Sequence, residues 1–75
     1  MQAKITLTPK AVKEFVSITS KCNFDIDIAS NNRYIVDAKS IVGIFGLDMT
    51  QPLTVTYRGY DPDLENFIKS HALAS

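Results

Sequence analysis

The sequence predicts an α+β fold of the open-faced β-sandwich type, in which helices cover one face of a four-stranded sheet. Four segments alternate apolar and polar side chains with the period of two that is typical of half-buried strands. Two other segments repeat apolar side chains every three or four residues, as amphipathic helices do. With a short helix between the third and fourth strands, the chain order is βαββαβα, and the outward strand positions are expected to face water. These positions are all polar: Lys4, Thr6, Asp25, Asp27, Thr54, Thr56 and Arg58.

The first two elements are a strand and a helix. Apolar residues alternate over residues 1–7, which predicts a strand with one buried face. Thr8 and Pro9 then begin a helix, because threonine is a good N-cap and proline fits the first turn. This helix should end near residues 20–22. Its apolar stripe is expected to comprise Val12, Phe15, Val16 and Thr19.

A hairpin and a fourth strand follow. Residues 24–28 alternate in hydrophobicity, and residues 34–38 are expected to pair with them. Residues 30–33 should form the turn, since asparagine tolerates positive φ. After a connection at residues 48–52, the β-forming residues 53–57 predict the last strand.

The last helix has a clear start signal. Asp61 is a good N-cap, Pro62 fits the first helical position, and Asp63 places negative charge at the positive end of the helix dipole. The buried side of this helix is expected to comprise Leu64, Phe67, Ile68 and Leu73.

Length and composition restrict the function. The 75 residues are expected to form one domain, 1–75, with a modest core. Eight basic and eight acidic residues cancel, which argues against general affinity for nucleic acid or for an anionic membrane. Cys22 is the only cysteine, so an intrachain disulfide is excluded. No signal peptide and no membrane-length apolar run is evident, so a cytoplasmic location is expected.

The short apolar segment between the third and fourth strands is the strongest candidate site. Lys39 and Ser40 precede it, and Ser40 is a good N-cap for a short helix. Residues 41–47 contain five large apolar side chains, more than one or two helical turns can bury on one face. Either the segment presents a docking surface, or it fills one edge of the core, with Gly43 and Gly46 allowing close packing.

This segment, residues 37–47, also resembles a known family. Together with the element order, it is similar to the histidine-containing phosphocarrier protein (HPr) of the bacterial sugar phosphotransferase system. That family has a Lys-Ser-Ile/Leu-Met-Gly run at its second helix, with the serine as a regulatory phosphorylation site. Residues 15–16 and 53–56 match its first helix and fourth strand. The resemblance implies one HPr-like domain with an antiparallel sheet of strand order 1-4-2-3.

The resemblance fails at the family's carrier site. The family motif Gly-Leu/Ile-His-Ala-Arg-Pro-Ala falls on residues 6–12, where Thr8 takes the histidine position and Lys10 the arginine position. A threonine phosphate is a stable ester, so the resemblance implies a family member without carrier activity. Thr8 is then either a helix cap or part of a weak anion site with Lys10.

The other reactive side chains favour structural roles. His71 lies late in the last helix, where the dipole repels phosphate. Cys22 has no base in its sequence neighbourhood. Two carboxylates alone make a poor metal site, so no metal is expected. With one histidine, one cysteine and no neighbouring acid–base pair, we also expect no cofactor and no enzymatic activity. The aspartate pairs are Asp25 with Asp27 and Asp61 with Asp63.

The sequence therefore favours a regulatory protein–protein interaction module, and the resemblance implies control by phosphorylation of Ser40. By resemblance, its partners would be phosphotransferase components, an HPr serine kinase or a transcription regulator. The alternative is a diverged HPr-fold adaptor that binds an unrelated partner and uses Ser40 only as a cap. A nucleic-acid module is disfavoured because the open sheet face lacks basic and aromatic side chains. The residues expected to contact a partner are Lys39, Ile41, Val42 and Phe45.

Overall fold

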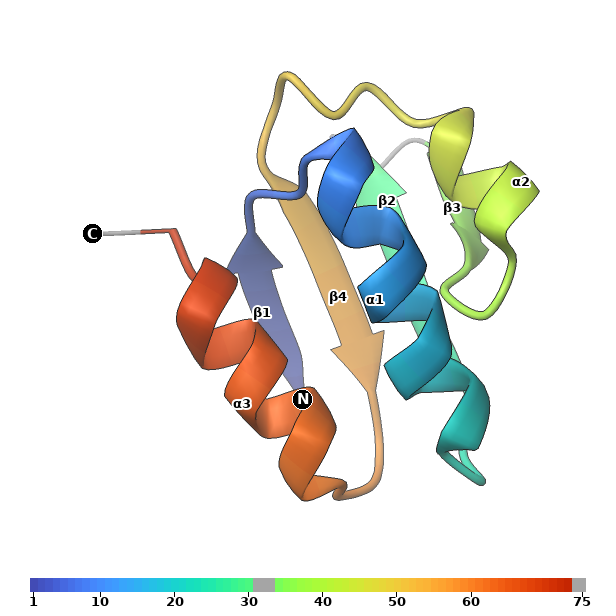
Figure 1. Ribbon diagram of the computed structural model, residues 1–75, viewed down its shortest axis with the longest axis vertical. Helices are drawn as coiled ribbons and strands as arrows, with labels where there is room; N and C mark the ends of the chain where they lie inside the picture. The colour runs from blue at the N-terminus through green and yellow to red at the C-terminus, as the bar shows by residue number, and fades with distance from the viewer. Residues whose placement is uncertain (31–33, 74–75) are drawn as a thin grey trace.

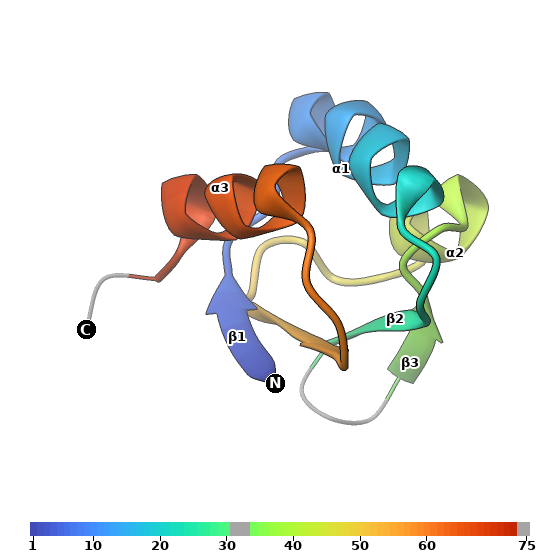
Figure 2. The same cartoon turned by 90° about the horizontal axis from the view of Figure 1, so that it is seen from below.

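The computed structural model describes residues 1–30 and 34–73 and has a four-stranded antiparallel sheet with three helices on one face (Figures 1 and 2). The strand order is β1-β4-β2-β3. The predicted fold class, element order and sheet topology are confirmed. The elements are β1 (Gln2–Ile5), α1 (Pro9–Lys21), β2 (Ile26–Ser30), β3 (Tyr34–Asp37), α2 (Ile41–Phe45), β4 (Leu53–Tyr57) and α3 (Pro62–His71).

The core lies between the sheet and the helices. Phe15 of α1 is fully buried and Phe67 of α3 is 4% exposed, with 5.2 Å between their ring centroids. Their contact joins the two long helices above the central strands, where Ile28 of β2 pairs with Val55 of β4. Apolar burial of this kind is the main favourable term in folding. The core also includes Ile5, Leu7, Val12, Ile26, Ile44, Leu53, Tyr57, Leu64 and Ile68.

The β1 edge of the sheet is closed by the segment that follows α3. Ile5 forms an isolated antiparallel bridge with Ala72, and the Leu73 N–H donates to the Lys4 carbonyl at 3.1 Å. Leu73 itself is 44% exposed and lies outside α3, so its expected place on the buried side of that helix was wrong. Backbone pairing along the edge places its side chain toward solvent.

The second strand starts later than expected. It runs Ile26–Ser30 rather than over residues 24–28, and Ser30 pairs with Tyr34 instead of starting the turn. Residues 31–33 of the expected turn lie outside the described residues. Phe24 is used differently: its ring packs against Gly59, where a Cβ would come within 2.4 Å of it. Gly59 has φ +154°, which also favours glycine.

The outer face of the sheet is less exposed than its polar sequence suggested. Thr54 is only 9% exposed, although it lies beside Lys4 and Ala29 on the central strand β4. Neighbouring strands on both sides restrict access of solvent to a short side chain at this position. Met1, at the start of the alternating pattern, is 70% exposed, although its backbone exchanges hydrogen bonds with Tyr57 of β4.

The phenylalanine contact gives a test of how α3 is docked. Phe67→Ala should lower the free energy of unfolding by about 3–5 kcal/mol, because it removes a buried ring and leaves a cavity. Phe45→Ala serves as the matched control, since Phe45 is 51% exposed and its loss should cost less than about 0.5 kcal/mol. Urea denaturation measures both. Equal midpoints for the two variants would show that α3 is not docked as described.

Candidate protein-binding surface around Ser40

Two hydrogen bonds hold the segment before α2 against α1. Thr19 is fully buried, and its Oγ1 donates to the Ala38 carbonyl at 2.8 Å. The Lys39 Nζ donates to the Cys22 carbonyl at 2.9 Å, at the C-terminal end of α1, where the helix dipole is negative. Lys39 was expected to contact a partner. In the structure its ammonium group instead binds the end of α1 and so helps to position α2.

Ser40 is the N-cap of α2, as predicted. Its Oγ accepts a hydrogen bond from the Gly43 N–H at 3.1 Å, and its carbonyl accepts from the Ile44 N–H at 3.1 Å. A Cβ at Gly43 would lie 3.2 Å from the Val36 Cβ and 3.3 Å from the Ser40 Oγ. The glycine therefore lets the helix lie directly against β3 while the cap bond is formed.

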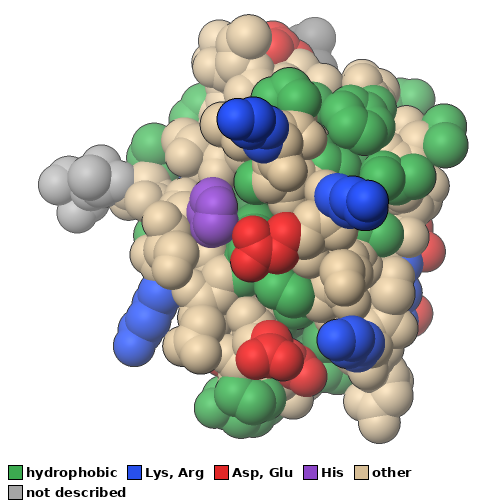
Figure 3. All heavy atoms as spheres, viewed as in Figure 1, with side chains coloured by type: hydrophobic (Ala, Val, Ile, Leu, Met, Phe, Trp, Pro, Cys, Tyr) green, Lys and Arg blue, Asp and Glu red, His purple; other side chains and the backbone are tan. Residues whose placement is uncertain are grey.

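Most of the apolar side chains of α2 face solvent. Ile44 is fully buried, whereas Ile41, Val42 and Phe45 are 40%, 80% and 51% exposed. We call these three residues the α2 patch. Figure 3 shows apolar side chains gathered on the side of the molecule where α2 lies. The sequence expectation that the segment cannot bury all its apolar residues is confirmed.

Tyr34 extends this apolar surface and was not singled out from the sequence. It is 58% exposed, and its Cε2 lies 3.7 Å from the position of a Cβ at Gly46, just after α2. The sequence position of Tyr34 could have indicated this: it lies two residues before Val36 in the edge strand β3, and residues two apart share a face of the sheet. Ile35 is also exposed, at 63%, but it lines a hollow on the outer face with Thr54 and Thr56.

Two solved structures share this arrangement. The crystal structure of HPr-C-His from Thermoanaerobacter tengcongensis aligns with a TM-score of 0.71 and 25% sequence identity, covering 93% of this chain and 92% of that chain. The phosphocarrier protein HPr from Bacillus anthracis str. Ames aligns with a TM-score of 0.71 and 25% identity, covering 95% of each chain. Over nearly its whole length the chain is therefore similar to HPr phosphocarrier proteins. No protein-family model and no curated protein matches the sequence.

The HPr resemblance assigned the carrier-histidine position to Thr8. This residue occupies the N-cap position of α1 and is exposed, but within the described part of the chain its side chain forms no capping hydrogen bond. The expectation that its hydroxyl caps the helix was wrong, because only its carbonyl contributes, accepting from the Ala11 N–H at 2.9 Å. Lys10 is exposed beside it. A weak anion site here stays a prediction.

Of the remaining candidate residues, Cys22 and Asp61 form structural hydrogen bonds. The Cys22 Sγ donates to the Ile18 carbonyl at 3.5 Å, and burial, reinforced by the Asp61 charge, raises the pKa of the thiol. Asp61 caps α3 by accepting from the Leu64 N–H at 3.0 Å. Asp25 and Asp27 are exposed. Among residues 1–30 and 34–73, no group of three His, Cys, Asp or Glu could hold a metal ion.

The same described residues contain no helix that is long and apolar enough to cross a membrane. The longest, α1, has 13 residues and carries lysines along its exposed side, whereas a transmembrane helix needs about 20 apolar residues.

The N-cap positions of α1 and α2 give a matched test of this site. Ser40→Ala removes the acceptor of the Gly43 N–H and should lower the free energy of unfolding by about 0.5–2 kcal/mol. Thr8→Ala removes a hydroxyl that forms no cap bond, so it should cost less than about 0.5 kcal/mol. Chemical denaturation of both variants measures the difference. Equal losses would contradict the finding that the Ser40 side chain caps its helix and the Thr8 side chain does not.

Proposed function

We propose that this chain is an HPr-like protein of the sugar phosphotransferase system that lacks the carrier histidine and acts by binding other proteins in the cytoplasm. The α2 patch is the proposed contact surface, together with Tyr34. The observation that supports the proposal is the exposure of three large apolar side chains on a five-residue helix. Exposed apolar side chains that cluster in this way are typical of protein-binding sites.

The absence of a carrier histidine supports a regulatory role rather than phosphoryl transfer. A carrier needs a phosphoramidate, which keeps onward transfer favourable, whereas a phosphothreonine at Thr8 would be a stable end product. His71, the only histidine, lies in the last turn of α3. Its Nδ1 is within 2.8 Å of the Phe67 carbonyl, and its ring stacks on that of Phe67.

Phosphorylation of Ser40 is the proposed control. A phosphate would add about −1.5 to −2 charges beside Ile41 and Val42 at neutral pH. It would also stand at the N-terminal end of α2, where backbone N–H groups and the helix dipole favour negative charge, by a few tenths to about 1 kcal/mol. The modification would therefore change the binding surface without unfolding the domain.

The alternative function is that of a diverged HPr-fold adaptor in which Ser40 only caps α2. The hydrogen bond from Gly43 to the Ser40 Oγ favours this reading, because it explains the serine without any modification. Both functions use the same α2 patch, and they differ in the partner that it binds and in whether a kinase modifies the Ser40 hydroxyl.

The loss of carrier activity can be tested with enzyme I and phosphoenolpyruvate. The chain should gain no acid-labile phosphate, because Thr8 occupies the carrier-histidine position and the only histidine, His71, lies on α3. An authentic HPr in the same reaction serves as the positive control, with intact mass measured before and after acid treatment. An acid-labile gain of one phosphate would overturn the proposal and would direct attention to His71.

Control through Ser40 can be tested with an HPr serine kinase. The kinase should phosphorylate the wild-type chain at Ser40, mapped by peptide mass spectrometry, and should leave Ser40→Ala unmodified. The phosphorylated protein should melt at or slightly above the temperature of the unmodified one. If an authentic HPr is labelled and this chain is not, phosphorylation control fails and the adaptor function replaces it.

A further inference from the structure

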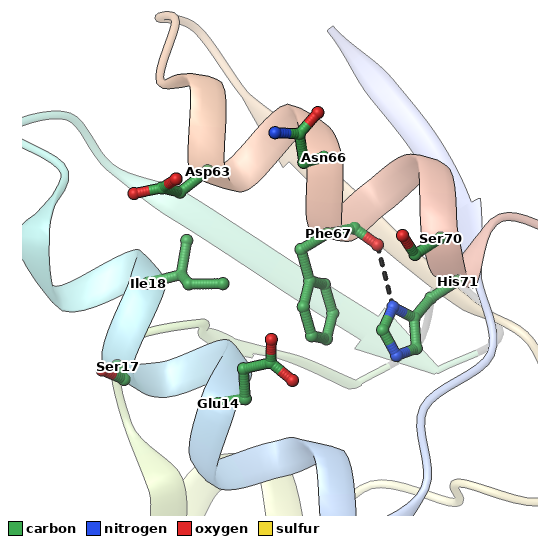
Figure 4. A pocket seen from close by; sticks show the side chains of 8 residues that line it. All are labelled: Glu14, Ser17, Ile18, Asp63, Asn66, Phe67, Ser70 and His71. Carbon is green, nitrogen blue, oxygen red and sulfur yellow. Dashed lines mark hydrogen bonds between the residues drawn. The ribbon is translucent and has the colours of Figure 1, made fainter.

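A cleft separates the two long helices on a face that the α2 patch does not reach. It has a volume of about 420 Å³ and is lined by residues of α1 and α3 (Figure 4). In Figure 3 the histidine and neighbouring carboxylates border this part of the surface. The lining residues are Glu14, Ser17, Ile18, Asp63, Asn66, Phe67, Ser70 and His71.

The polar groups of the cleft are suited to accept hydrogen bonds from a cation. Glu14 on α1 and Asp63 on α3 are both exposed carboxylates. The Phe67 carbonyl can only accept, so the His71 Nδ1 donates to it, at 2.8 Å, which fixes the imidazole at one end of the cleft. None of the eight lining residues is Lys or Arg. A cation would therefore meet complementary charge from both helices.

Between these groups the cleft is apolar. Ile18 is half-buried and Phe67 is 4% exposed, and Figure 4 shows their side chains between the two helices. Asp63 and His71 are eight residues apart on α3, which corresponds to about 12 Å along the helix axis. The site thus combines an elongated apolar floor with one carboxylate on each of the two helices.

We infer that this cleft binds a linear aliphatic polyamine, with its ammonium groups at Glu14 and Asp63 and its methylene chain over Ile18 and Phe67. The charge complementarity is local, because the whole chain has eight basic and eight acidic residues and no general attraction for polycations is expected. Lys10 and Lys13 are exposed on α1 but do not line the cleft. The inference does not depend on the proposed function of α2.

Spermidine is the probe, titrated into the ¹⁵N-labelled full chain and followed by amide chemical shifts. Saturable shifts should be confined to α1 and α3. Glu14→Gln and Asp63→Asn should each raise the dissociation constant for spermidine about fivefold, because each variant removes one exposed ion pair with the ligand. Asp25→Asn is the matched control: it removes the same charge elsewhere on the surface and should leave the dissociation constant unchanged.

A second pair of variants tests the cleft without removing a carboxylate. Ser17→Lys places an ammonium group in the cleft and should abolish the shifts, whereas Ser20→Lys, also exposed on α1 but outside the lining, should preserve most of the affinity. An uncharged chain of similar length, 1,8-octanediol, should not bind. Non-saturable shifts, shifts at acidic residues over the whole surface, or equal effects of the two lysine variants would overturn the inference.

Discussion

One buried hydrogen bond determines where the candidate binding surface lies. The hydroxyl of Thr19, which is fully buried in α1, donates to the carbonyl of Ala38 at 2.8 Å. If the segment before α2 moved away, the Ala38 carbonyl would lose this donor, and the Thr19 hydroxyl would keep only its longer bond, 3.2 Å, to the Val16 carbonyl of its own helix. Losing one such hydrogen bond costs about 0.5–1.5 kcal/mol. The hydrogen bond from the Lys39 ammonium group to the Cys22 carbonyl, at the C-terminal end of α1, holds the same segment against α1. The start of α2 is therefore fixed, and Ser40 with it.

The exposure of the α2 patch follows from that fixed start and from helix geometry. At 100° per residue, Ile41, Val42 and Phe45 project over one side of the helix, and Gly43 and Ile44 project over the other. Gly43 lies against Val36 of β3, and Ile44 is fully buried. A helix of five residues has only one inward side, so its remaining apolar side chains must face solvent. The patch results from the position of the helix as much as from its composition.

The features that could be predicted from the sequence are those governed by local rules. Strand periodicity predicted the four strands, although their order in the sheet came from the resemblance to HPr. The helix starts at Ser40 and Asp61 followed from N-cap preferences, since both side chains accept from the N–H three residues on. Contacts between distant segments could not be predicted. Three features depend on how distant elements pack in three dimensions: the packing of Phe24 on Gly59, the hydrogen bond from Lys39 to α1, and the cleft between α1 and α3.

Both candidate surfaces depend on α1, which contacts α2 at one flank and α3 at the other. α1 is a continuous helix of 13 residues whose buried residues Val12, Phe15 and Thr19 anchor it to the core. A ligand in the cleft would contact the α3 flank of this helix, whereas a phosphate on Ser40 would stand on α2. Coupling between the two sites would require α1 to shift as a body, which would disrupt the contact of Phe15 with Phe67. Close packing resists such shifts, so occupancy of one surface should leave the affinity of the other unchanged.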